Sequence, residues 1–279
     1  MNFESPFAQD TEFHKLLLRE SRVDLTTAAL ELARDFYPGL DFGTVKSWIT
    51  DRAAELTGPM ALARNDHELL ATLATCLAGT HGITGSAEIY EQADGSFLNR
   101  VIEQKAGIPI SLSVLYMGVA KEAGLPLRGV SAPGHFLTRY DGAAGPLFLD
   151  AFNGGHIMSL SEALSRVETA TGLTSDVALS TLDKAGPRAI ILRMLNNLKG
   201  LFSRQENWLG ACLVQNRLTA LQPTSYKERR DQAIFTLQAR QPGRAIDLLE
   251  TCLHNCPTEE QPLLQQKLAE ARRQCALSN

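Results

Sequence analysis

The stretch from residue 107 to residue 155 most constrains the fold of this chain, because its hydrophobic period changes there from that of a helix to that of strands. Pro109 suits the first turn of a helix over 110–123, where its missing N–H is no loss. Gly124 fits a left-handed C-cap, and Pro126 prevents the helix from continuing. Apolar and polar residues alternate after that point. The stretch therefore predicts a helix packed with a small sheet.

Turn residues divide the alternating segment. Pro133-Gly134 marks one turn, residues 141–145 a second, and Asn153-Gly154 is a favoured two-residue hairpin turn. We expect strands near 128–132, 134–140 and 147–152. Such short connections join neighbouring antiparallel strands, so the sheet is expected to be antiparallel.

The residues before this stretch are typical of helices. Asp24 can cap one helix, a second runs from Asp41 or Thr44 to a stop near Gly58-Pro59, and a further helix covers about 66–77. The polar stretch 81–95 contains three glycines and reads as a long loop. Loops of that length inside a domain are usually functional or mobile.

The C-terminal third is helical and repetitive. Residues 172–187 read as loose, and we place a domain boundary near 183, which gives domains 1–182 and 183–279. Pro223 and Pro257 lie 34 residues apart, the period of tetratricopeptide helix pairs. Small residues recur at the same offset, at Ala211 and Ala245. A helix over 259–275 would cap the last repeat.

Composition excludes several classes of partner. The formal charge of −4, with 44% apolar and 21% charged residues, gives no electrostatic footprint for nucleic acid. No apolar run approaches the roughly 20 residues that span a bilayer. The N-terminus lacks the pattern of a signal peptide. Five cysteines without regular spacing do not form a disulfide framework, so we expect a cytoplasmic protein with no membrane partner.

His135 and Asp150 form the first candidate site. A hairpin closed through 141–146 brings their two strands side by side, so that His135 and Asp150 are within about two residues of being directly opposite each other. A carboxylate that accepts from an imidazole N–H fixes the ring's tautomer and orients its other nitrogen. The same pair also fits a buried hydrogen bond that only satisfies two polar groups. Spacing leaves both interpretations open.

A nucleophile would benefit from the positive end of the helix that starts at 109–113. No cysteine lies there. Ser111 and Ser113 carry the only hydroxyls at the helix start, and a serine nucleophile needs both a base and an oxyanion hole. The cysteines fit core or surface positions of helices: Cys76, Cys212, Cys252, Cys256 and Cys275.

We expect no metal and no cofactor. His156 could approach His135, and Asp150 would then complete a metal site, but no ligand spacing such as His-x-x-x-His supports it. The glycines show no phosphate-binding pattern. The other histidines read as surface residues: His14, His67, His81 and His254.

Several motifs resemble a known family. They are Ser96–Asn99, Gly107–Ser113, Pro133–Phe136 and Asp150–Gly155. Together they resemble the bacterial transglutaminase-like family with a tetratricopeptide tail, of the invasion regulator B type. Its superfamily shares a core with papain-type cysteine proteases. There the order is a Cys at a helix start, a Gly-Ile-Pro-like turn about fifteen residues on, a His strand and an Asp strand.

The match fixes the position of the missing nucleophile. Gly124-Leu125-Pro126, His135 and Asp150 follow the superfamily order, and ungapped counting back from Gly124 puts the nucleophile at Pro109. Proline offers neither a nucleophilic atom nor an N–H. The resemblance therefore implies the fold, while a proline at the nucleophile position argues against transglutaminase or protease activity.

These observations predict an α+β fold that is mostly α. A transglutaminase-like, papain-type core with a helical N-terminal half and a small antiparallel sheet precedes a helical tail of tetratricopeptide type. The first function hypothesis is a non-catalytic protein- or peptide-binding or regulatory module with its cleft near Ser111, His135 and Asp150. The alternative is an amide-bond hydrolase or acyltransferase with Ser111 or Ser113 as nucleophile, His135 as base and Asp150 as its orienting group. In a third hypothesis, the His135–Asp150 pair only staples the sheet of a regulatory scaffold.

Overall fold

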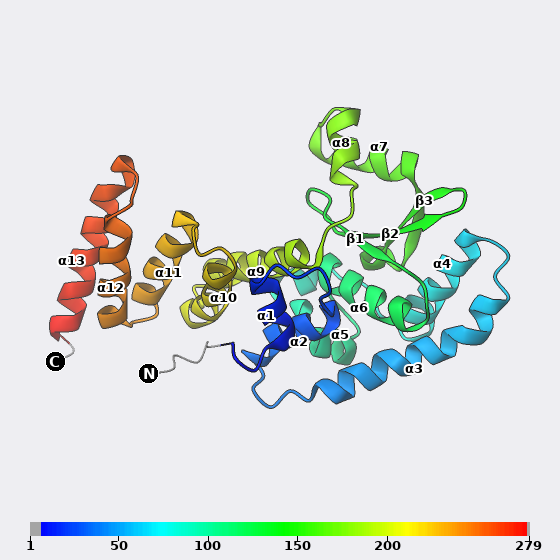
Figure 1. The fold of residues 1–279 in the computed structure, drawn as a ribbon, viewed down its shortest axis with the longest axis horizontal. Helices are drawn as coiled ribbons and strands as arrows, with labels where there is room; N and C mark the ends of the chain where they lie inside the picture. The colour runs from blue at the N-terminus through cyan, green and yellow to red at the C-terminus, as the bar shows by residue number, and fades with distance from the viewer. Residues whose placement is uncertain (1–6, 278–279) are drawn as a thin grey trace. The chain divides into compact units, whose positions relative to one another are not determined.

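The computed structural model describes residues 7–277 and confirms the predicted fold class, a mostly helical chain with one small antiparallel sheet (Figure 1). Contacts within the chain divide it into two compact units, residues 1–194 and 195–279. The domain limits 1–182 and 183–279 remain a proposal. No helix in the described range 7–277 has the length and apolar character needed to cross a membrane.

Helices make up most of the first unit. In chain order they are α1 (Thr11–Leu17), α2 (Leu25–Arg34), α3 (Phe42–Ala61), α4 (Asp66–Ala74), α5 (Leu98–Gln104), α6 (Pro109–Glu122), α7 (Leu160–Thr171), α8 (Ser175–Thr181) and the start of α9 (Pro187–Arg204). Asp24 caps α2 as predicted, because its side chain accepts from the N–H of Thr27. α3 continues through Pro59, two residues past the predicted stop, which is within the usual spread of helix ends.

Shorter helical turns follow α4. The π-helical turn η1 (Thr75–Thr80) continues directly from α4, and the 3₁₀ turns η2 (Glu88–Glu91) and η3 (Ala93–Ser96) lie in the predicted loop 81–95. The π-turn could not be predicted, since the amino-acid pattern of a helix that ends near 77–79 is the same in either form. Turns of this kind occur often at functional sites.

The sheet has four antiparallel strands in the order β1-β2-β3-β4. They are β1 (Arg128–Val130), β2 (Leu137–Gly142), β3 (Gly145–Asp150) and β4 (His156–Ser159). The predicted strands are confirmed with shifted ends. β3 and β4 are joined by the 3₁₀ turn η4 (Ala151–Asn153) and Gly154, which has φ 66°, rather than by a two-residue turn alone.

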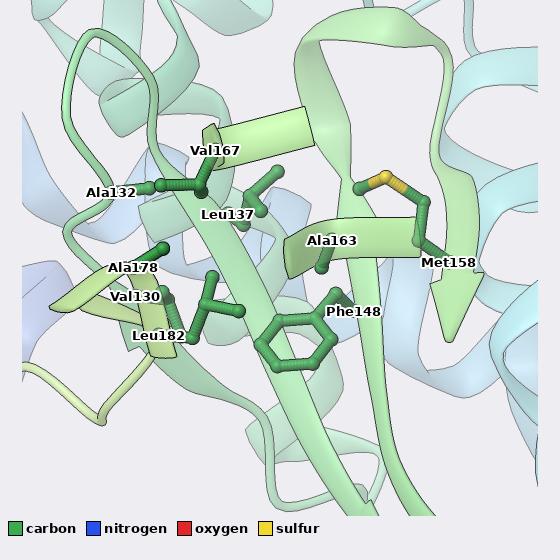
Figure 2. Packing of buried hydrophobic residues seen from close by; sticks show 9 residues of the cluster. All are labelled: Val130, Ala132, Leu137, Phe148, Met158, Ala163, Val167, Ala178 and Leu182. Carbon is green, nitrogen blue, oxygen red and sulfur yellow. The ribbon is translucent and has the colours of Figure 1, made fainter. Parts of the chain in front are cut away.

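One face of the sheet packs against α7 and α8, and α6 contacts β1 and β2 (Figure 1). Figure 2 shows the buried apolar side chains between the sheet and helices α7 and α8, with Phe148 of β3 among them. Ala178 of α8 and Leu182 just after it belong to this cluster and are fully buried. The expectation that 172–187 is loose was therefore wrong: packing on the sheet holds α8, although flanking glycines hide it in the sequence. A capping box of Ser159 and Glu162, a pattern of serine followed three residues later by glutamate, opens α7.

The second unit is built of helices, and from α10 to α13 each helix contacts the next. After the end of α9 come α10 (Trp208–Leu221), α11 (Tyr226–Gln238), α12 (Pro242–Leu253), the 3₁₀ turn η5 (Thr258–Glu260) and α13 (Gln261–Leu277). Ala211 and Ala245, the small residues of the 34-residue offset, are both fully buried. α13 occupies the place of the predicted capping helix.

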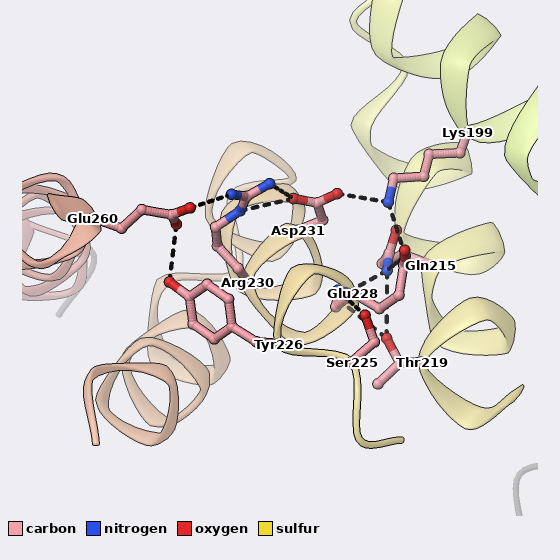
Figure 3. Close-up of polar contacts among 9 residues, drawn as sticks. All are labelled: Lys199, Gln215, Thr219, Ser225, Tyr226, Glu228, Arg230, Asp231 and Glu260. Atoms are coloured by element: carbon pink, nitrogen blue, oxygen red, sulfur yellow. Dashed lines mark hydrogen bonds and ion pairs between the residues drawn. The ribbon is translucent and has the colours of Figure 1, made fainter. Parts of the chain in front are cut away.

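Charged side chains connect the helices of this unit (Figure 3). Nζ of Lys199 lies 2.9 Å from Oε2 of Glu228 and 2.6 Å from Oδ2 of Asp231. Nε2 of Gln215 donates to the same Glu228 oxygen at 2.8 Å. Arg230 joins Asp231 to Glu260, so the network runs from α9 to η5.

Candidate functional site

The β2–β3 hairpin places His135 and Asp150 together. Asp150 ends β3, and His135 lies in the turn before β2. Thr138 pairs with Leu149, so the next partner of Asp150 would be Leu137, two residues from His135. Nε2 of His135 lies 2.8 Å from Oδ1 of Asp150. The imidazole N–H is not aligned as in a hydrogen bond, so the contact is chiefly electrostatic.

Asp150 is fully buried, and both of its oxygens are engaged. Nη1 of Arg166 on α7 lies 2.8 Å from Oδ2, and Nδ2 of Asn153 donates to the same oxygen at 2.7 Å. Burial opposes ionisation of this carboxyl, but the contacts with His135, Asn153 and Arg166 outweigh burial and lower its pKa. The Asp150 carboxyl is therefore ionised at neutral pH, with Arg166 beside it.

One aromatic ring borders His135, and a second ring packs on the first. Phe152 meets the imidazole edge-to-face with ring centres 6.2 Å apart, and Tyr90 packs on Phe152 at 5.4 Å. Tyr90 is 43% exposed, so its ring is accessible beside the site. Burial and the charge of Asp150 raise the pKa of the Tyr90 hydroxyl, which therefore stays protonated and able to donate.

The loop 81–95 is fastened to this aromatic wall. The N–H of Gly85 donates to the carbonyl of Phe152 at 3.0 Å. A Cβ at Gly85 would lie 2.2 Å from Cδ2 of Phe152, so only glycine fits under the ring without displacing it. The loop thus sets the position of Phe152 and carries Tyr90 to it.

The predicted serines are buried at the start of α6. The hydroxyl of Ser111 donates to the backbone carbonyls of Gly95 and Ile108. Within residues 7–277, Oγ of Ser113 has no hydrogen-bond partner. Pro109 occupies the first position of the helix, as its sequence position suggests. The Ser111 hydroxyl thus hydrogen-bonds to main-chain carbonyls rather than to His135.

His156 lies beside this group, because it pairs with Asp150 in the β3–β4 register, and its side chain is exposed. The spacing of the sequence pointed to the His135–Asp150 pair. It did not indicate Arg166 or Tyr90, which come from elements that only the folded chain brings near, and the place of Phe152 two residues after Asp150 did not show that its ring meets His135.

Three residues of metal-binding type come together elsewhere in the first unit. Glu55, Cys76 and His81 place their ligand atoms within 4.8 Å of one another. Burial, with the charge of Glu55, raises the pKa of the Cys76 thiol to about 11, so this thiol is no resting nucleophile. His81, which was predicted to lie at the surface, is partly buried, and its Nε2 lies 2.7 Å from Oε2 of Glu55. The other thiols lie in the second unit.

The geometry supplies a proton-accepting imidazole, a buried anion and an accessible aromatic wall. A histidine beside a carboxylate can exchange a proton with a bound group or hydrogen-bond to it. Stacking surfaces such as Tyr90 and Phe152 suit a peptide or another planar group.

Comparison with known proteins assigns both units. The family model of the transglutaminase-like superfamily matches residues 44–196, and a tetratricopeptide repeat model matches 198–273. A UPF0162 protein of Xylella fastidiosa, strain Temecula1, is 31% identical over 250 residues, which cover 86% of each chain. The UPF0162 protein YchA of Escherichia coli K12 is 25% identical over 254 residues, 90% of each chain.

Another relative matches only part of the chain. F-box only protein 21 of Mus musculus is 32% identical over 129 residues, 43% of this chain and 20% of that protein. No solved structure matches the chain significantly. These matches agree with the order of helix, histidine strand and aspartate strand in the sequence, and with the hairpin that joins His135 to Asp150. The chain belongs to the transglutaminase-like superfamily, among the UPF0162 proteins.

Proposed function

We propose that this protein is a non-catalytic, cytoplasmic protein- or peptide-binding module with a regulatory role, of the invasion regulator B type. The observation that carries the proposal lies at the start of α6. Pro109 stands where the superfamily order puts a nucleophile, and the Ser111 hydroxyl is bonded to main-chain carbonyls. The His135–Asp150 pair is nevertheless complete.

The surface around His135 supports recognition of a chain segment. Tyr90 and Phe152 offer stacking faces, and aromatic residues are enriched among the residues that dominate binding energy. His135 adds a polar group that can bond to a peptide amide or carbonyl. Because Asp150 and Arg166 satisfy each other, the charge beneath the site is already compensated before a ligand binds.

The helical tail supports a protein partner. Tetratricopeptide repeats stack into extended surfaces that bind other proteins. The net charge of −4 argues against nucleic acid as the ligand.

A binding experiment tests this function. Peptides are selected from a displayed random library on the whole protein, and their affinities are measured by fluorescence anisotropy. We expect Tyr90→Ala and His135→Ala to weaken binding about tenfold. Leu62→Ala, which removes an exposed apolar side chain at the end of α3, is the matched control and should bind like wild type. Equal affinities for all four proteins would contradict a peptide site at His135.

A second assay separates binding from catalysis. The protein is incubated with a glutamine-containing peptide and a fluorescent amine, and with an activated ester. We expect no turnover above that of buffer. Turnover that disappears in Ser111→Ala or Ser113→Ala would instead favour the amide hydrolase or acyltransferase with a serine nucleophile.

A further inference from the structure

We infer that Glu55, Cys76 and His81 form a binding site for zinc, with one coordination position left open. Glu55 belongs to α3, Cys76 belongs to the π-helical turn η1, and His81 is the residue that directly follows η1. Their ligand atoms all lie within 4.8 Å of one another.

The distances already approach those of a metal centre. Sγ of Cys76 lies 3.6 Å from Oε2 of Glu55, and Nε2 of His81 lies 2.7 Å from the same oxygen. Ligand atoms around a tetrahedral zinc ion are roughly 3–4 Å apart, given metal–ligand distances of about 2.0–2.3 Å. A slight outward movement of the imidazole would make room for the ion.

The chemistry of the donors selects the metal. A thiolate, an imidazole and a carboxylate together suit zinc, whereas calcium and magnesium prefer oxygen ligands only. In the absence of an ion, one carboxylate oxygen of Glu55 lies close to both the thiol and the imidazole. Zinc would replace these contacts, and the thiol proton of Cys76 would leave to solvent on binding.

Neighbouring side chains orient two of the ligands. Nη2 of Arg52 lies 2.8 Å from Oε1 of Glu55, which leaves Oε2 directed to Cys76 and His81. Trp48 packs against the His81 ring with centres 6.1 Å apart, and the Arg52 guanidinium lies over the Trp48 ring, 5.2 Å from its centre. Such outer partners are a regular part of metal sites.

The surroundings leave room for a further ligand. Glu55 and Cys76 line a groove of about 480 Å³ between α3, α4 and η1. With three protein ligands, the fourth position faces solvent or this groove and can take water, as in zinc sites that keep an exchangeable position. The π-turn supports the assignment, because it departs from regular helix where Cys76 is presented.

Cobalt provides the test, because it reports its ligands by its spectrum. Chelator-treated whole protein is titrated with Co²⁺ and then with Zn²⁺. We expect one Co²⁺ per chain, a sulfur-to-cobalt charge-transfer band and displacement by Zn²⁺. Cys76→Ala should abolish the band, and Glu55→Gln or His81→Gln should weaken binding at least about tenfold.

Matched controls make the outcome decisive. Cys212→Ala removes a buried thiol of α10 and should leave the band unchanged. Glu55 is exposed, so Glu55→Gln keeps the proposal testable if Cys76→Ala fails to fold. Absence of stoichiometric binding would overturn the assignment. A band that survives Cys76→Ala but is lost in Cys252→Ser would also overturn it, since the metal would then sit in the second unit.

Discussion

Nη2 of Arg193 donates a 2.9 Å hydrogen bond to the backbone carbonyl of His135, 58 residues earlier in the chain. Nη1 of the same guanidinium donates to Oγ of Ser131 at 2.6 Å and to the carbonyl of Ala132 at 2.9 Å. The guanidinium also lies over the ring of Phe136. One side chain of α9 therefore fixes the whole turn that carries the candidate site histidine.

Arg193→Met is the first prediction. It leaves main-chain carbonyls of a partly buried turn without donors, and hydrogen bonds to a charged group are worth about 1.5–3 kcal/mol. We expect a loss of unfolding free energy of that size, with faster amide hydrogen exchange in residues 131–137. Arg64→Met is the control, because Arg64 is 84% exposed and its pair with Glu68 should contribute little. Unchanged exchange at 131–137 would contradict the role of Arg193.

The second prediction concerns pH and Asp150. Its folded-state pKa is lowered from the ordinary value of 3.8, so the carboxylate stabilises the fold above about pH 3.8. This stabilisation is lost as the pH falls through the lowered folded-state pKa. At neutral pH, Asp150→Asn should cost about 2–4 kcal/mol, because Arg166 and His135 lose their shared partner.

Unfolding of both proteins between pH 7 and pH 2 provides the measurement. The difference in unfolding free energy between wild type and Asp150→Asn should shrink below about pH 4. A constant difference across this range would mean that ionisation of Asp150 does not contribute.

Gly85 gives the third prediction. Its added Cβ would lie 2.2 Å from Phe152, so Gly85→Ala must displace the ring that borders His135. We expect a cost of about 1–3 kcal/mol from this overpacking and a changed chemical shift of the His135 imidazole. Gly58→Ala is the matched control, because a Cβ there meets nothing within 4 Å. Equal effects of the two substitutions would exclude a special contact at Gly85.

Local signals predicted most of the first unit. Asp24 and Ser159 mark helix starts because capping depends on residues three or four apart. A hairpin also depends on residues that are close in the sequence, and its spacing predicted that His135 and Asp150 lie together. The sequence could not show α8, whose Ala178 and Leu182 are held by the sheet, since that contact is between distant segments.

Most of the site residues that the sequence missed make contacts between distant segments of the chain. Arg166 and Arg193 reach the His135–Asp150 pair from α7 and α9. Glu55 lies 26 residues from His81, so neither helical nor hairpin spacing relates them. Fold class follows from local pattern in this chain, whereas the composition of each site depends on how the helices pack.

The last prediction tests the charged network of the second unit. Lys199 lies between Glu228 and Asp231, and all three side chains are largely buried. Lys199→Met removes the shared cation and leaves two carboxylates facing each other, so we expect a loss of about 2–4 kcal/mol. Adding Glu228→Gln to Lys199→Met removes one of these charges and should recover part of the loss, which makes the double-mutant cycle non-additive.

Hydrogen exchange resolves this effect by unit, because one global unfolding curve does not separate two units. Faster exchange is expected in α10 and α11, with α2 and α6 unchanged. Lys267→Met is the control, since its pair with Glu270 joins neighbouring turns of one helix and is more exposed. If Lys199→Met behaved like Lys267→Met, the buried charges would be compensated by Gln215 and Arg230 alone, and Lys199 would be dispensable to the packing of these helices.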